Sequence, residues 1–224
     1  DLPPHPVIVP DLPKDMASAL GRRSHTERTG AGQSGESTSE HALMTRYARK
    51  VDQALRPVLS GHERPLIIAA AEPMASVYRA VSSYPHTADE VIAGSADHTP
   101  DHELAAATRA VLDRLYTAEI SAFADLYAER EAQGRATSDI AQAARAATFG
   151  AVDTMIVDID AVIPGTVADS DGAVSFAEGA DAGNYGIVDE IAARALKSGA
   201  RIIAARRDDI PGGGALAVVL RYAI

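Results

Sequence analysis

Apolar residues first fall into a regular period near residue 40. They recur at steps of three and four, the spacing that places side chains on one face of an α-helix. These positions are Leu43, Tyr47, Val51, Ala54, Leu55 and Val58. Ser37 and Glu40 have the spacing of a capping box. The pattern therefore predicts a helix over about 40–59, preceded by a polar loop over 21–39.

Short apolar runs alternate with helical patterns in the next stretch. The run 66–71 is continuously apolar, as in a strand that is covered on both faces. Pro73 favours the start of a short helix that reaches about Ser82. A strand over 91–93 and a long helix from Asp101 follow, and Gly134 is expected to close that helix.

The pattern restarts after Gly134, where we place a domain boundary between residues 1–134 and 135–224. The second part is expected to contain helices over 138–147 and 187–197. Asp171-Gly172 is a hairpin signal. Strands are expected over 152–157, 201–205 and 216–222. This order predicts a compact α/β sandwich, so the chain is expected to be an α/β protein of two domains.

Composition restricts the classes of function. The chain has 224 residues, 46% of them apolar, no cysteine and a net charge of −10. Disulfides and thiolate chemistry are therefore excluded, and non-specific nucleic-acid binding is disfavoured. No run is long enough to cross a bilayer and no signal peptide precedes the first element, so a cytoplasmic location is expected. Because the chain begins with Asp1 rather than Met, a fragment lacking an N-terminal domain stays an open alternative.

Positive charge is concentrated in one segment of this acidic chain. Residues 22–50 hold six basic residues against three acidic ones. The basic residues are Arg22, Arg23, Arg28, Arg46, Arg49 and Lys50. Arginine can clamp phosphates through two parallel hydrogen bonds, so these side chains are candidates for RNA contacts. A solvated charged loop is the alternative for the first three.

Three glycines surround one glutamine in the segment 29–39. Gly30, Gly32 and Gly35 allow backbone conformations that other residues avoid. Gln33 offers an uncharged amide that can position a water or stabilise a developing oxyanion. An ordinary surface loop would have the same composition, and both interpretations stay open on composition alone.

Other candidate sites are weaker. His98, Asp101 and His102 could hold a metal, but the capped start of a helix already explains Asp101. Gly212-Gly213-Gly214 could cradle a phosphate, but a turn between strands is the simpler interpretation. No dinucleotide fingerprint is present, and no metal or organic cofactor is implied.

The order of these segments resembles a known family. A loop ending Gly32-Gln33-Ser34, a basic helix carrying Arg46–Val51 and the apolar strand Leu66–Ala71 are similar to the central domain of archaeo-eukaryotic class-1 peptide-chain release factors, of Pelota-type rescue factors and of their bacterial relatives. In residues 135–224, the segments Gly150–Val157, Val188–Glu190, Ile210–Gly214 and Ala217–Tyr222 resemble the third domain of that family.

This resemblance implies an RNase H-like central domain followed by an α/β sandwich of the kink-turn-binding ribosomal-protein type. It implies a ribosome-associated translation factor whose 21–39 loop is directed at the A-site region, the rRNA and the peptidyl-tRNA acceptor end. Gln33 would orient a water at the ester and Gly32 would allow close approach. Ala31 stands where the family's first glycine stands.

Two non-catalytic alternatives stay open. One is a ribosome-binding rescue or dormancy factor, in which the loop only fills a site. The other is an acidic adaptor that binds a protein partner through residues 135–224.

Overall fold

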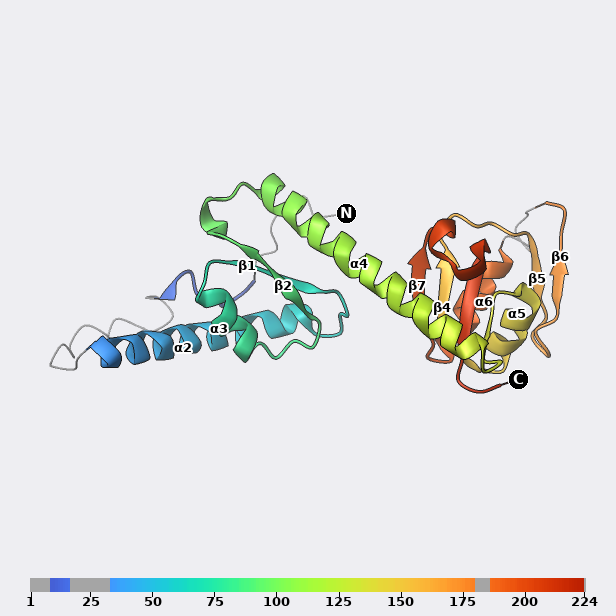
Figure 1. Ribbon diagram of the computed structural model, residues 1–224, viewed down its shortest axis with the longest axis horizontal. Coiled ribbons are helices and arrows are strands. Elements are labelled where there is room, and N and C mark those ends of the chain that lie inside the picture. Colours follow the sequence, from blue (N-terminus) through green and yellow to red (C-terminus); the bar gives the residue numbers. More distant parts are fainter. Residues whose placement is uncertain (1–8, 17–32, 180–185, 224) are drawn as a thin grey trace. The chain divides into compact units, whose positions relative to one another are not determined.

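The structure of the protein is a computed structural model, and it describes residues 9–16, 33–179 and 186–223 (Figure 1). It has a mixed α/β fold, as predicted. The chain divides into two compact units, Asp1–Arg114 and Leu115–Ile224, and the division falls within the long helix α4 (Asp101–Glu131). Gly134, where the sequence analysis places a boundary, follows the end of that helix at a positive φ of 67°.

The first unit is built on a β-α-β motif (Figure 1). Its strands β1 (Leu66–Ala70) and β2 (Thr87–Ala93) pair in parallel, and α3 (Met74–Val81) connects them. Helix α2 (Gln33–Leu59) packs against α3. The predicted strands and the short helix are confirmed, although β2 begins earlier than the apolar run suggested. A short 3₁₀ helix, η1 (Ala96–His98), precedes α4.

Apolar side chains from these elements form one core in the first unit. Ala48 of α2 and Ala75 of α3 are fully buried, and Ile68 of β1 packs with them. Because Ala48 and Ala75 carry only a methyl group, the two helices can approach each other closely. The apolar period of α2 predicts a helix with one buried face, and this core confirms it.

Helix α2 differs from the prediction at its start. It begins at Gln33 rather than near residue 40, so Ser37 and Glu40 lie inside the helix and do not cap it. The predicted loop over 29–39 is therefore helical from Gln33 onward. The first two turns are polar throughout, so they show no apolar period that would predict a helix.

The second unit contains a four-stranded sheet in the order β3-β8-β4-β7. β4 and β7 run parallel, whereas β8 is antiparallel to β3 and β4. The strands are β3 (Ala136–Thr137), β4 (Val152–Asp158), β7 (Arg201–Ala205) and β8 (Leu216–Leu220). β3 was not predicted, because two residues are too short to show an alternating pattern.

Helices cover both faces of this sheet (Figure 1). Helices α5 (Ile140–Thr148) and α6 (Ile187–Lys197) cover one face, and Phe123 and Tyr127 of α4 cover the other. Along β8, Leu216, Val218 and Leu220 face α5 and α6, whereas Ala217 and Val219 face α4. Every residue of β8 is buried, which explains why its sequence is apolar without alternation.

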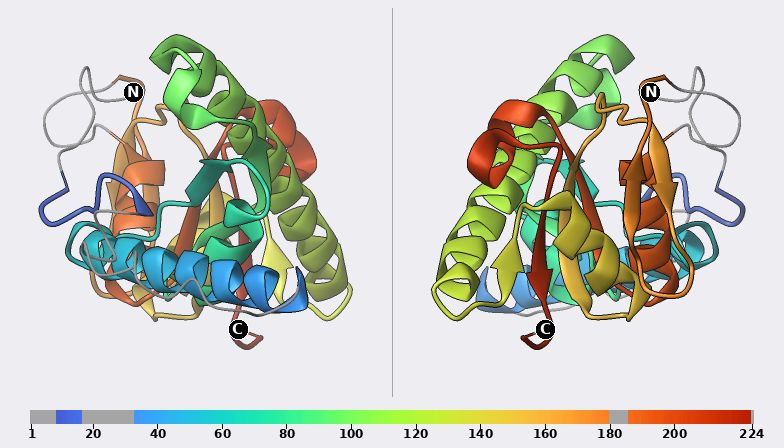
Figure 2. Two further views of the ribbon diagram at one scale, coloured as in Figure 1. Left: turned by 90° about the vertical axis from the view of Figure 1, so that its left-hand side faces the viewer. Right: turned by 90° about the vertical axis from the view of Figure 1, so that its right-hand side faces the viewer.

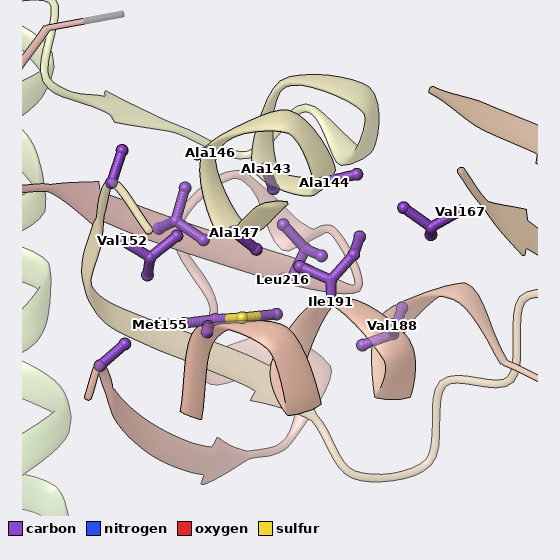
Figure 3. Packing of buried hydrophobic residues seen from close by; sticks show 14 of the residues in the cluster. Ala143, Ala144, Ala146, Ala147, Val152, Met155, Val167, Val188, Ile191 and Leu216 are labelled. Carbon is purple, nitrogen blue, oxygen red and sulfur yellow. The ribbon is translucent and has the colours of Figure 1, made fainter. Parts of the chain in front are cut away.

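The larger core lies between the sheet and α5 and α6. Met155, Ile191 and Leu216 are fully buried there, and Figure 3 shows Ile191 and Leu216 close together below the alanines of α5. Four alanines of α5 point into this core: Ala143, Ala144, Ala146 and Ala147. Burying a side chain of the size of Leu or Met contributes about 1.5–3 kcal/mol, so this core is the main source of stability in the unit.

A hairpin packs beside α5 and α6. Its strands β5 (Gly165–Val167) and β6 (Val174–Phe176) are antiparallel, and the turn contains the predicted Asp171-Gly172. Arg194 of α6 joins the elements. Its guanidinium donates to the carbonyl oxygens of Val167 and Ala168 at 2.8 and 2.9 Å and to the Thr148 hydroxyl at 2.9 Å.

The remaining turns follow the sequence closely. Pro211–Gly213 forms a short 3₁₀ helix, η3, ahead of β8, after another, η2 (Arg207–Asp209). The interpretation of the three glycines as a turn between strands is thus confirmed. Gly212 has a φ of 82° and Gly213 a φ of 64°, a region that glycine adopts without strain.

Candidate nucleic-acid interface

Helix α2 has a basic outer face opposite its buried face. Arg46, Arg49, Lys50, Gln53 and Arg56 are all exposed, and their spacing of three and four residues places them along one side of the helix. We call these five residues the α2 basic face. Since the helix rises ~1.5 Å per residue, the face extends over ~15 Å. It presents four cations to solvent along one line.

One carboxylate of α2 offsets part of this charge, because Asp52 pairs with Arg56. From His41 to the end of α2 the only acidic residue is Asp52, and its side chain is only 6% exposed. Asp52 lies on the side of the helix that packs inward, where it accepts hydrogen bonds from protein groups. The α2 basic face is therefore positive although the whole chain is acidic.

Asp52 connects α2 to the loop after α3. The backbone N–H of Ser83 donates to Asp52 Oδ1 at 2.8 Å, and the Ser83 hydroxyl donates to Oδ2 at 2.9 Å. Arg56 Nη2 donates to Oδ2 at 3.0 Å. Burial by itself would raise the pKa of Asp52, but the hydrogen bonds from Ser83 and Arg56 outweigh it and lower the pKa. The carboxylate is thus charged at neutral pH and holds Arg56 in place.

Arg46 and Arg49 are not neutralised in this way. Neither guanidinium makes a hydrogen bond or an ion pair with any residue that the structure describes. Both are on the first half of the basic face, and the carboxylate of Asp52 pairs with Arg56 rather than with Arg49. Two unpaired guanidinium groups one helical turn apart can each grip a phosphate with a pair of hydrogen bonds.

A turn near the N-terminus adds one cation, Lys14, and one carboxylate, Asp11. Residues 10–14 and the α2 residues Lys50, Gln53 and Pro57 line a cavity of about 670 Å³. Lys14 is exposed at this cavity. Lys14 and Arg56 were not among the predicted RNA contacts. Arg56 could have been found, because it lies seven residues after Arg49 on the same helical face, whereas no pattern in the sequence pointed to Lys14.

The structure brings together only part of the predicted site. Arg46, Arg49 and Lys50 share one face, as their spacing requires. Gln33 is the first residue of α2. The other predicted site residues, Gly32, Arg22, Arg23 and Arg28, lie outside the described residues. Within the described part of the chain, no three side chains of the metal-binding types come together, and this includes the region of His98 and His102.

Comparison with protein families gives a match over residues 1–118, more than half of the chain, to bacterial archaeo-eukaryotic release factor family 11. The chain belongs to this family. The family 11 match covers α2, the β-α-β motif and the first half of α4, and so includes the whole α2 basic face.

Solved structures similar to the family 11 chain include a release-factor domain and two Pelota chains. The C-terminal domain of a peptide chain release factor from Methanosarcina mazei matches at 20% identity with a TM-score of 0.37, covering 57% of this chain and 98% of that one. Archaeoglobus fulgidus Pelota matches at 15% identity with a TM-score of 0.39, covering 77% of this chain and 53% of that one.

A further similar chain belongs to a model of ribosome-bound archaeal Pelota and ABCE1. It matches at 17% identity with a TM-score of 0.49, covering 91% of this chain and 53% of that one. The family 11 chain thus spans about half the length of these two Pelota chains. No curated protein sequence matches it.

None of the helices in the described ranges is both long enough and apolar enough to cross a membrane. This holds for α4, the longest of them at 31 residues, because charged residues recur along its length.

Proposed function

We propose that this protein is a ribosome-associated translation factor that contacts RNA through the α2 basic face. The observation that carries the proposal is the pair Arg46 and Arg49, exposed and unneutralised by the described residues on an acidic chain. An acidic protein avoids general binding to nucleic acid, and a local cationic face restricts contact to one place. Membership of a release-factor family supports the ribosome as the source of that RNA.

The same proposal assigns roles to the parts of the chain. Residues 1–134 would form the RNase H-like central domain and residues 135–224 the α/β sandwich of the kink-turn-binding type. The segment ending at Gly32 and Gln33 would approach the acceptor end of peptidyl-tRNA in the A-site region. Arg22, Arg23 and Arg28 would add phosphate contacts to those of Arg46, Arg49 and Lys50. Such a factor would act in the cytoplasm.

Co-sedimentation with purified ribosomes tests the RNA contact. Arg46→Glu/Arg49→Glu should shift the protein from the pellet to the supernatant. The matched control is Arg109→Glu/Arg207→Glu, which makes the same change of charge at exposed arginines outside α2 and should pellet like wild type. Equal binding by both variants would contradict a contact through the α2 basic face. A wild-type protein that stays in the supernatant would favour the adaptor alternative.

Peptidyl-tRNA hydrolysis is the finer part of the proposal. The Gly32-Gln33 pair supports it, and Ala31 in place of a glycine favours the non-catalytic alternative. A release assay on ribosomes carrying labelled peptidyl-tRNA separates the two. If the protein is hydrolytic, wild type releases peptide and Gln33→Ala does not. If wild type binds ribosomes without releasing peptide, the protein is a rescue or dormancy factor that only occupies the site.

A further inference from the structure

A groove lies in the second unit between strand β3 and helix α5. It has a volume of about 350 Å³. The end of β8 runs between β3 and α5 (Figure 2, right), and Leu220 forms the floor. Thr137 lies on the strand side, and Gln142, Arg145 and Phe149 lie on the helix side. The three helix-side residues are spaced at i, i+3 and i+7 and therefore form one stripe along α5 and its C-terminal end.

The end of the groove at the C-terminus of α5 exposes two large apolar side chains. Phe149 is 56% exposed and Tyr222 is 51% exposed. They are neighbours in space, because the Tyr222 hydroxyl donates to the carbonyl oxygen of Phe149 at 3.4 Å. A large apolar side chain gains free energy when it is covered. An occupant with an apolar group at this end is therefore favoured.

Two cations belong to the same surface. Arg145, one helical turn before Phe149, is exposed, and its side chain has no hydrogen bond or ion pair with the described residues. Arg221 donates to the carbonyl oxygen of Gly150 at 3.1 Å, which places its guanidinium close to the end of α5. From residue 139 to residue 149 the only acidic residue is Asp139, the N-cap at the opposite end of α5. An anionic occupant is thus favoured over a cationic one.

The geometry favours a helical occupant over an extended one. The N–H of Leu220 donates to the carbonyl of Arg135 at 2.8 Å, so the N–H and C=O of the next residue, Ala136, point away from β8 and from the groove. A strand added to β3 would therefore leave the groove empty, and its neighbouring side chains would point to opposite faces. A helix beside α5 presents residues four positions apart on one face, ~6 Å apart along its axis, as Arg145 and Phe149 are along α5.

We propose that this groove binds an amphipathic helix of a partner protein, which carries a large apolar residue and an acidic residue four positions away. The apolar side chain would enter the groove above Leu220 and cover Phe149, as in other complexes of a helix with a groove. The carboxylate would pair with Arg145. Nucleic acid fits poorly, because acidic residues outnumber basic ones in residues 115–224. The inference is independent of ribosome binding by α2.

Three alanine-rich peptides test this assignment, each of about 18 residues so that it can form a helix in water. The first carries one leucine with a glutamate four residues before it and another four residues after it, and so fits in either direction. In the second, the leucine is moved by one residue, which turns it about 100° around the helix. The third has lysines in place of the glutamates. Each is titrated into the ¹⁵N-labelled full chain and followed by amide chemical shifts.

The first peptide should move the amides of Thr137, Arg145 and Phe149 and should bind about tenfold more tightly than either of the other two. Arg145→Glu should remove the preference for glutamate over lysine. Phe149→Ser should weaken the first peptide about tenfold. Both side chains are exposed, so both variants should retain the wild-type melting temperature. Arg207→Glu changes the charge by the same amount outside the groove and should leave all three affinities unchanged.

Several results would overturn the proposal. It is wrong if the first peptide does not bind at millimolar concentration, if moving the leucine makes no difference, or if Arg145→Glu keeps the preference for glutamate. It is also wrong if a single-stranded RNA oligonucleotide, titrated in the same way, binds the groove more tightly than the first peptide. None of these results depends on whether the chain binds ribosomes.

Discussion

Asp52 of α2 accepts the backbone N–H of Ser83 at 2.8 Å, although the two residues are 31 positions apart in the sequence. The same carboxylate accepts the Ser83 hydroxyl and pairs with Arg56. This contact restricts the rotation of α2 about its own axis. When Asp52 is held against Ser83, Arg46 lies about 120° further round the helix and faces solvent, and Arg49, three residues before Asp52, lies between the two directions and is exposed. The buried carboxylate of Asp52 thus helps to fix which side of α2 faces solvent, and with it the orientation of the α2 basic face.

Replacing Asp52 should therefore destabilise the first unit. Asp52→Ala leaves the Ser83 N–H without its acceptor and should cost ~2–4 kcal/mol of unfolding free energy. Asp52→Asn keeps an acceptor for that N–H but removes the charge, and should cost about half as much. Urea denaturation at pH 7 measures both. Asp89→Asn, at a fully exposed carboxylate, is the control and should change stability little.

The lowered pKa of Asp52 predicts a specific acid response. Its folded-state pKa lies below the ordinary value of 3.8. The carboxylate therefore contributes stability fully above about pH 4. That contribution disappears as the pH falls through the folded-state pKa. The stability difference between wild type and Asp52→Asn should be constant from pH 5 to 7 and shrink below pH 4. A difference that instead grows on acidification would contradict this assignment.

Arg194 should be among the most sensitive positions of the second unit. Its side chain is 12% exposed and pairs with Asp169 and Glu190, each at 2.7 Å, in addition to its hydrogen bonds with two carbonyls and Thr148. Lysine lacks the planar fork needed for these partners. Arg194→Lys should cost ~2–3 kcal/mol in urea denaturation, whereas Arg207→Lys at an exposed site should cost almost nothing. Equal effects would mean that this network adds no stability.

Gly172 is fixed by two constraints at once. Its φ is 73°, and an added Cβ would lie 2.7 Å from the Cα of Arg145 and 2.8 Å from the carbonyl oxygen of Ala144. Gly172→Ala should therefore destabilise the second unit by more than ~1 kcal/mol, as strained replacements of glycine do. Gly179→Ala is the matched control, because no described atom lies near its Cβ and its φ is unstrained. Thermal melting compares the two.

The salt dependence of ribosome binding should report how many phosphates the α2 basic face neutralises. For each phosphate that a variant no longer neutralises, the slope of log affinity against log salt becomes shallower by about 0.7–0.9. Arg46→Ala/Arg49→Ala should therefore reduce the slope by roughly 1.5. Arg109→Ala/Arg207→Ala should leave the slope unchanged. A reduced affinity with an unchanged slope would mean that these arginines act through something other than phosphate binding.

The sequence predicts well those elements whose residues contribute to a core. Helix α6 has the predicted bounds, because Ile187, Val188 and Ile191 all face one side and Gly199 follows. The hairpin at Asp171-Gly172 is also found, since its turn requires that residue pair. By contrast, α2 begins at Gln33, and no apolar period extends that far. β3 is a strand because it pairs with β8, and its own two residues are too few to show a strand pattern.

The candidate site is less predictable than the fold. Spacing alone shows that Arg46, Arg49 and Lys50 share a face of α2. It does not show that Asp52 faces inward to Ser83, because that hydrogen bond joins residues far apart in sequence. The groove that is lined by Thr137, Arg145, Phe149 and Leu220 could not be predicted at all. Its shape depends on how β3, α5 and β8 pack together, and no local sequence pattern shows this packing.

The alanines on the inner side of α5 have an effect beyond stability. Ala143, Ala144, Ala146 and Ala147 are buried against the sheet, and their small size sets how closely the helix approaches it. Arg145 lies on this helix and Phe149 directly follows it, so a larger residue at any of the four would move both away from β3. Buried methyl groups thus set the spacing between α5 and β3, and a substitution in the interior would alter the surface that Arg145 and Phe149 present to solvent.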